Sequence, residues 1–281
     1  MKKKECAGAA INDNRASDER LDQYYTHPDV AAYFYAIFRE HFDPAVFLLV
    51  EPSGGTGSFL KVMPVGSVSY DVEPKYPGIQ TADFLTVRID SDRPVAIIGN
   101  PPFGRNASMA VRFFEHAAAQ ARVIAFILPR SFRKASIENR LHRYFHLIRE
   151  EPVPHDAFLF RGKPFNVPAL FQVWEWRSYP RPVRPDITWH PDFEFVTPDL
   201  ADFVIRRVGA LAGRLHHDFT ASDSSNYFIR GDVEHFMAQI DFRTVAADVA
   251  GIPSLAKAEI VELYHALRYP LRAAGSSGTG I

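Results

Sequence analysis

The stretch AIIGNPPFGRN, residues 96–106, joins an apolar run directly to an amide, two prolines and an aromatic ring. The apolar part does not alternate with polar residues, which is typical of a strand buried on both faces of a sheet. The two prolines fix two φ angles and remove two backbone N–H donors, so they end the strand in a stiff turn. We therefore expect a buried strand whose carboxyl end presents Asn100.

Apolar runs of the same kind occur on both sides of this stretch, at residues 45–50, 67–72 and 122–129. The segment 107–121 carries its apolar residues at helical spacing and predicts an amphipathic helix. Strands and helices that alternate in this order predict an α/β fold with a doubly wound, mostly parallel sheet. Two more strand-like runs, at residues 156–160 and 169–176, are expected to form an antiparallel hairpin at one edge of the sheet.

The composition of the chain changes along its length and predicts four parts. Residues 1–19 and 271–281 are polar or small and are expected to be flexible tails. Residues 20–178 hold the predicted α/β domain. The proline- and arginine-rich stretch RSYPRPVRPD, residues 177–186, is interpreted as a basic linker, and its arginines include Arg181 and Arg184. We expect residues 179–270 to form a smaller α+β region.

Charge and cysteine content exclude several classes of protein. The chain has 281 residues and a formal net charge of −1, so any contact with nucleic acid must come from local basic patches. The single cysteine, Cys6, excludes an internal disulfide framework and a cysteine-rich zinc site, and it fits a reducing compartment. No metal site is expected. The chain begins without the apolar core of a secretory signal and has no run long enough to span a bilayer, which favours a soluble, cytoplasmic protein.

A glycine-rich loop, EPSGGTGSF at residues 51–59, follows the first predicted strand. Glycines let the backbone turn tightly and approach a ligand closely. The loop matches neither the GxxxxGK[ST] phosphate loop nor GxGxxG, and it carries no lysine. Glu51 comes directly before the glycines, where a carboxylate repels a pyrophosphate and suits a cationic or amine-bearing ligand.

Acidic side chains follow the next two strands of the predicted sheet. Asp71 ends the second run, where an acid commonly binds ribose hydroxyls, and Asp83 stands beside Phe84 in the third turn. Each acid alone is compatible with a turn or a helix cap. With Glu51, however, they outline an adenosine site that lacks a phosphate-binding element. S-adenosylmethionine, with its ribose, adenine, ammonium group and sulfonium charge, fits that description.

The turn after the central strand has the acceptors that an amine requires. A planar amine can donate one hydrogen to the side-chain oxygen of Asn100 and the other to the carbonyl of Pro101. Phe103 can then stack on the attached ring, an interaction worth about 1–3 kcal/mol for a base on an aromatic platform. Such acceptors free the lone pair of an exocyclic amine for attack on a sulfonium methyl group, which is catalysis by positioning and electrostatics.

The ordered set EPSGGTGSF, YDVEP, ADF and GNPPFG resembles the motifs of S-adenosylmethionine-dependent amino-methyltransferases. It is most similar to DNA N6-adenine methyltransferases of the gamma arrangement, in which the cofactor motifs come first and the target-recognition region last. The segment DQYYTHPDV, residues 22–30, resembles the family's N-terminal cofactor motif. The resemblance covers roughly residues 22–176. It implies the class I methyltransferase fold, a Rossmann-like sheet of seven strands.

The resemblance also implies roles for individual residues. The cofactor-binding residues that it implies are Tyr25, Thr26, Glu51, Pro52, Gly54, Gly55, Gly57, Asp71, Val72, Asp83, Phe84 and Asn100. The catalytic residues that it implies are Asn100, Pro101, Pro102 and Phe103. The sequence departs from the family at Phe103, where tyrosine is more frequent, so stacking is kept and a hydroxyl contact is lost. The aromatic residue that stacks on the other face of the base falls on Phe165, with Phe160 as the alternative.

Basic residues near strand ends predict a rim that binds phosphates. Those on the predicted active face are Arg105, Arg130, Arg133, Lys134 and Lys163. The family acts on a base rotated out of its stack, so we expect a nucleic-acid partner, with DNA ahead of RNA. Methylation of a protein glutamine amide and a non-catalytic partner with the same fold remain alternatives. The short chain suggests a stand-alone enzyme that serves a separate restriction enzyme or acts as an orphan such as phages carry. The target sequence and the oligomeric state stay open.

Overall fold

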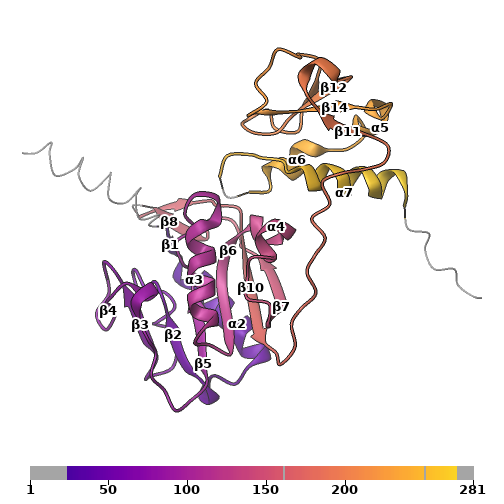
Figure 1. Cartoon of the computed structure of the whole chain (residues 1–281). Coiled ribbons are helices and arrows are strands. Elements are labelled where there is room, and N and C mark those ends of the chain that lie inside the picture. The colour runs from indigo at the N-terminus through magenta and orange to yellow at the C-terminus, as the bar shows by residue number, and fades with distance from the viewer. Residues whose placement is uncertain (1–23, 161, 250, 271–281) are drawn as a thin grey trace, which may run out of the picture. The chain divides into compact units, whose positions relative to one another are not determined.

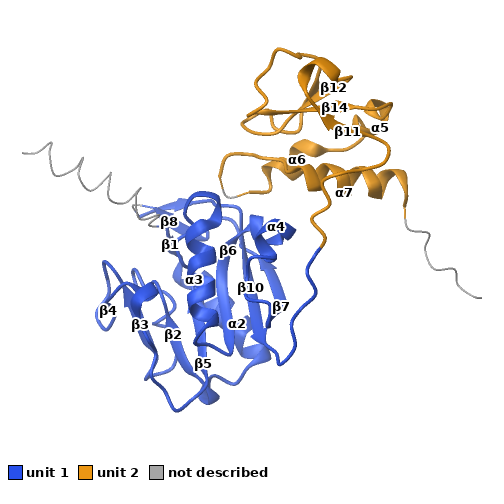
Figure 2. Cartoon of the chain, in the orientation of Figure 1, with its two compact units in different colours: residues 1–184 blue, residues 185–281 orange. Residues whose placement is uncertain are grey.

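The computed structural model describes residues 24–160, 162–249 and 251–270 (Figure 1). The chain divides into two compact units, residues 1–184 and residues 185–281, which we call unit 1 and unit 2 (Figure 2). Within the described ranges, none of the helices combines the length and the apolar character that crossing a bilayer requires.

Unit 1 is built on a seven-stranded sheet with the strand order β4-β3-β2-β5-β6-β10-β7. These strands are β2 (Leu48–Glu51), β3 (Val68–Asp71), β4 (Gln80–Thr81), β5 (Val95–Gly99), β6 (Val123–Pro129), β7 (Phe145–Pro152) and β10 (Ala169–Trp176). The five strands from β4 to β6 are parallel, whereas β10 is antiparallel to both β6 and β7. The predicted α/β fold with a doubly wound, mostly parallel sheet of seven strands is confirmed.

Helices on opposite faces of this sheet explain why its strands are apolar without alternation. Helix α2 (Pro28–His41) packs in one core cluster with Ala96, while α3 (Ser108–Ala118) packs in a second cluster with Ile97. Successive residues of β5 and of β6 enter the two clusters in turn, so every position of these strands is buried. Helix α2 begins at Pro28, where the His27 side chain caps it by accepting from the Asp29 amide.

The antiparallel pair at the edge of the sheet is formed by other strands than the sequence predicted. The run at 156–160 was expected to pair with 169–176, and this pairing is wrong. It contains β8 (Phe158–Phe160), which pairs instead with β1 (Tyr25–Thr26) and β9 (Lys163–Phe165) in a separate three-stranded sheet. The outermost strand beside β10 is β7, whose alternating burial is typical of a strand with one open face.

Unit 2 contains a four-stranded antiparallel sheet with the order β11-β14-β12-β13. Its elements are β11 (Glu194–Val196), β12 (Phe203–Arg206), β13 (Leu215–His216), β14 (Asn226–Arg230), α5 (Glu234–Met237), α6 (Phe242–Ala247) and α7 (Lys257–Arg268). Its core joins Ile205 and Ile229 of the sheet to Met237 and Tyr264 of the helices. Unit 2 therefore has a hydrophobic core of its own.

The start of the predicted linker is fastened to unit 1. Arg181 is buried and donates to the carbonyls of Leu141 and His142, each at 2.9 Å. Arg184 forms an ion pair with Glu138 of α4 (Ala135–Glu138), with 2.7 Å between Nη1 and Oε2. These two arginines bind groups of unit 1, and the boundary between the units falls at residues 184 and 185, near the end of the predicted linker.

Candidate active site

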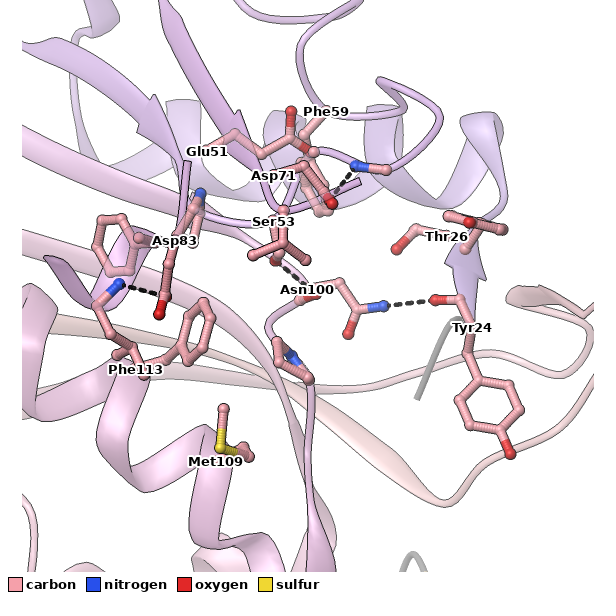
Figure 3. A pocket seen from close by; sticks show the side chains of 18 of the residues that line it. Tyr24, Thr26, Glu51, Ser53, Phe59, Asp71, Asp83, Asn100, Met109 and Phe113 are labelled. Carbon is pink, nitrogen blue, oxygen red and sulfur yellow. Dashed lines mark hydrogen bonds between the residues drawn. The ribbon is translucent and has the colours of Figure 1, made fainter. Parts of the chain in front are cut away.

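Unit 1 contains a cavity of about 360 Å³ (Figure 3). Many of the residues that line it belong to the segments that follow β2, β3 and β5. The strand order of the sheet reverses between β2 and β5, which are hydrogen-bonded neighbours. Open α/β sheets bind their ligands at this reversal, beyond the carboxyl ends of the strands. The volume lies in the usual range for small-molecule sites.

The structure brings most of the predicted cofactor and catalytic residues into the lining of this one cavity. They are Tyr25, Thr26, Glu51, Pro52, Gly54, Gly55, Asp71, Val72, Asp83, Phe84, Asn100 and Pro102. Gly57, Pro101 and Phe103 are not among the residues that line it. Gly57 lies against the ring of Tyr76, so a Cβ at this glycine would stand 2.6 Å from a ring carbon.

The glycine loop brings the backbone close to β1. Gly55 has a φ of +48°, and a Cβ built on it would lie 2.7 Å from the ring of Tyr25. Only glycine accepts both the left-handed conformation and this close approach without strain. The Gly55 amide donates to Oδ2 of Asp71 at 2.8 Å, so the end of β3 holds the loop in place.

Glu51 is almost completely buried, with 2% of its surface exposed. Its Oε2 accepts from the Leu60 amide at 3.1 Å and from the Ser69 hydroxyl at 3.0 Å. Burial raises the pKa of Glu51 to about 8, and the two hydrogen bonds offset only part of that effect. A cation beside the carboxyl would favour its ionised form and lower this pKa.

Asp71 and Asp83 each accept hydrogen bonds from backbone amides and still have unused acceptor lone pairs. Oδ1 of Asp71 accepts from the Glu73 amide at 2.8 Å, and Oδ1 of Asp83 accepts from the Leu85 amide at 3.0 Å. Asp83 thereby caps the short 3₁₀ turn Phe84–Thr86. Each carboxylate oxygen has a second lone pair, so both acids still have acceptors for hydroxyl or amino donors of a ligand.

Helix α3 supplies a wall of the cavity that the sequence analysis missed. Met109, Arg112 and Phe113 line the cavity, and the ring of Phe113 stacks on that of Phe84 with 5.5 Å between centroids. Their spacing of three and four residues places them on one face of the helix, which is a signal the sequence contains. Further lining residues without a predicted role are Tyr24, Ser53, Thr56, Ser58, Phe59, Ala82, Leu85 and Gly104.

The orientation of the Asn100 side chain is set by its neighbours. Its Nδ2 donates to the Tyr24 carbonyl at 3.1 Å, as Figure 3 shows. A carbonyl only accepts, so the amide nitrogen must face Tyr24 and Oδ1 must face the other way. The backbone carbonyl of Asn100 accepts from the Ser53 hydroxyl at 2.9 Å. Asn100 therefore presents a fixed acceptor where it lines the cavity.

The aromatic residues predicted to contact a base lie outside the cavity. Phe103 is partly buried and packs against the core cluster around α2. Phe165, 40% exposed, stacks on Tyr24 with 5.0 Å between centroids, and Phe160 packs on the same ring at 5.4 Å. Both candidates for the second stacking residue are thus neighbours of Tyr24, whose carbonyl holds the Asn100 amide.

The predicted phosphate-binding residues of unit 1 are exposed or partly exposed and lie in three places. Arg105 is in the turn after β5, Lys163 is in β9, and the others follow β6, at Arg130, Arg133 and Lys134. None of the five lines the cavity. Arg133 forms an ion pair with Glu150 at 2.8 Å, which partly neutralises its charge.

No family model matches the chain, and no curated protein matches it. Solved structures are similar at low identity. A modification subunit of a putative type I restriction enzyme from Vibrio vulnificus matches with a TM-score of 0.42 and 16% identity over 59% of this chain. The match spans 48% of that protein, about half of its length.

Two further structures match over a similar share of the chain. A putative RNA methyltransferase from Pyrococcus horikoshii matches at 15% identity and a TM-score of 0.41, covering 56% of this chain and 88% of that one. A putative class I S-adenosylmethionine-dependent methyltransferase from Listeria monocytogenes matches at 13% identity and a TM-score of 0.38, covering 53% and 58%. These likenesses concern the fold.

Proposed function

We propose that the protein transfers a methyl group from S-adenosylmethionine to the N6 amino group of adenine in DNA. The observation that carries this proposal is the fixed Asn100 acceptor at the edge of a cavity with acidic lining. The cavity lies at the ligand-binding reversal of the sheet, and its glycine loop is preceded by Glu51, a carboxylate that disfavours a pyrophosphate.

The cavity residues would hold the cofactor along its length. Glu51 takes the ammonium group, because ionising a buried carboxyl is favoured by a cation beside it. Asp71 accepts from the ribose hydroxyls, and Asp83 accepts from the adenine amino group. Phe84 and Phe113 form an apolar wall for the adenine ring. Bound in this way, the cofactor supplies an electrophilic methyl group on its sulfonium.

The turn at Asn100 would hold and activate the acceptor. Oδ1 of Asn100 and the carbonyl of Pro101 each accept one hydrogen of the target amine, which localises its lone pair on nitrogen. The nitrogen–carbon bond forms as the sulfur–carbon bond breaks, and the amine loses one proton to solvent. Positioning and hydrogen bonding carry this step, so no strongly basic side chain is required.

The acceptor adenine must leave the base stack to reach this turn. Phe165, with Phe160 as the alternative, would stack on the extruded base beside Tyr24. The partly exposed cations Arg130 and Lys134 would bind the phosphate backbone. Residues 179–270 would recognise the target. The enzyme would work in the cytoplasm, either beside a separate restriction enzyme or as an orphan such as phages carry.

The proposal is tested by digesting DNA and RNA from cells that express the protein and measuring N6-methyladenine in each by mass spectrometry. We expect the modified base in DNA, and its loss when Asn100→Ala is expressed at the same level. N6-methyladenine gained in RNA alone would replace DNA with RNA as the substrate. No gain in either polymer would overturn the proposal.

A further inference from the structure

The turn after β5 has unusually few ways to be held by the rest of the protein. Pro101 and Pro102 have no N–H, so the backbone between Asn100 and Phe103 offers almost only carbonyl acceptors. The Phe103 carbonyl is used by α3, since it accepts from the amides of Met109 and Ala110, each at 3.2 Å. The Asn100 side chain is held through its Nδ2, which donates to the Tyr24 carbonyl, but the Asn100 backbone carbonyl needs a donor from another segment.

Ser53 supplies that donor. Its hydroxyl donates to the Asn100 backbone carbonyl at 2.9 Å across a separation of 47 residues (Figure 3). Ser53 belongs to the loop after β2, which continues into Gly54 and Gly55. The residue pairs of β2 and β5 end at Val50 and Ile97, before either loop begins. Among the described residues, no other hydrogen bond joins residues 52–57 to the turn at residues 100–103.

The hydrogen bonds that hold Asn100 do not use the two acceptors that the proposed methyl transfer requires. Because Ser53 takes the backbone carbonyl of Asn100 and Tyr24 takes its Nδ2, the side-chain Oδ1 is left to face a ligand. In the described part of the chain, no hydrogen bond to the Pro101 carbonyl occurs either. The two acceptors of the proposed reaction are thus the ones that the protein does not use.

We propose that Ser53 is a positioning residue for methyl transfer, which fixes the acceptor-binding turn relative to the loop that holds the methyl donor. This inference rests on the proposed function and goes beyond it. The attacking nitrogen and the methyl carbon are held by different loops, so a small shift between the loops lengthens the reacting distance. Misplacement on the order of 1 Å costs about a hundredfold in rate.

The test is single-turnover methyl transfer to DNA by the full chain, together with S-adenosylmethionine affinity by calorimetry. We expect Ser53→Ala to lower the single-turnover rate by roughly 10- to 100-fold while the Kd of the cofactor changes by less than about threefold. Ser53→Thr keeps the hydroxyl, and we expect it to restore most of the rate. A merely structural serine would not produce this split between rate and affinity.

Ser67→Ala is the matched control, because the Ser67 hydroxyl also donates to a backbone carbonyl, that of Pro64 at 2.7 Å, but outside the cavity lining. We expect it to react at the wild-type rate. A wild-type rate in Ser53→Ala, or an equal loss in Ser53→Thr, would overturn the role of Ser53 and leave the proposed function standing. A wild-type protein that methylates neither DNA nor RNA would overturn the proposed function, and the role of Ser53 with it.

Discussion

The burial of Glu51 predicts how the stability of the ligand-free protein changes with pH. Its pKa is raised from an ordinary value of 4.5 to about 8 in the fold, mainly because the carboxyl is removed from water. Between these two values the folded protein binds a proton that the unfolded chain has released. Stability therefore falls as pH rises through this window. Over the range from pH 4.5 to about 8 the loss is roughly 5 kcal/mol at most, since one pH unit corresponds to about 1.4 kcal/mol.

The perturbation is Glu51→Gln, which keeps the shape of the side chain and removes its titration. The amide oxygen can still accept from Leu60 and Ser69. We expect urea denaturation to give similar free energies of unfolding for the wild type and the variant at pH 5. At pH 8.5 we expect the variant to be the more stable by a few kcal/mol. An identical pH dependence in the two proteins would refute the reasoning.

Binding of a cationic ligand should reverse the advantage of the variant. S-adenosylmethionine at pH 7 is expected to ionise Glu51 and to release about one proton, which calorimetry in buffers of different ionisation enthalpy detects. Glu51→Gln should bind more weakly and release no proton through this site. Proton release of the same size from the variant would assign it to another group.

Three further changes probe the cavity and the rim. Gly55→Ala forces a Cβ against Tyr25 at a positive φ. We expect cofactor affinity to fall by at least about tenfold in calorimetry, with a lower Tm. Unchanged affinity would mean that the loop is not the cofactor loop. Asp71→Asn removes the negative charge and keeps one acceptor oxygen for the two amides that Asp71 holds, those of Gly55 and Glu73. We therefore expect a lower Tm and weakened cofactor binding, and normal binding would remove Asp71 from the ribose site. Lys134→Glu should weaken DNA binding and reduce the slope of log K against log salt by about one, and an unchanged slope would exclude Lys134 from the phosphate contacts.

The fold and the gathering of the acidic residues in one cavity were predictable because they depend on local pattern. Continuous apolar runs identify strands buried on both faces, and the residues after each run must meet at one edge of a parallel sheet. Glu51, Asp71, Asp83 and Asn100 therefore fell together in one cavity. The contribution of α3 was missed because Phe113 belongs to the hydrophobic core and also lines the cavity.

Strand pairing and side-chain burial that depend on segments distant in the sequence were not predictable from local pattern. The choice of β7 as the partner of β10 depends on how the chain crosses the sheet. β7 carries Arg149, Glu150 and Glu151, so its apolar signal is weaker than that of the run at residues 156–160. Arg181 has the sequence context of an exposed linker. Its guanidinium is buried because it donates hydrogen bonds to the carbonyls of Leu141 and His142. The hydrogen bond from Ser53 to Asn100 spans 47 residues and has no local signal.

The most direct test of the account is methyl transfer by purified protein from radiolabelled S-adenosylmethionine to duplex DNA, followed by digestion and identification of the labelled base. The account predicts label in N6-methyladenine with the wild type. For Asn100→Ala it predicts a loss of at least about a hundredfold in rate with cofactor affinity retained, because Asn100 would act on the acceptor. Near-normal turnover by Asn100→Ala would contradict the central claim, as would label found in a base other than adenine.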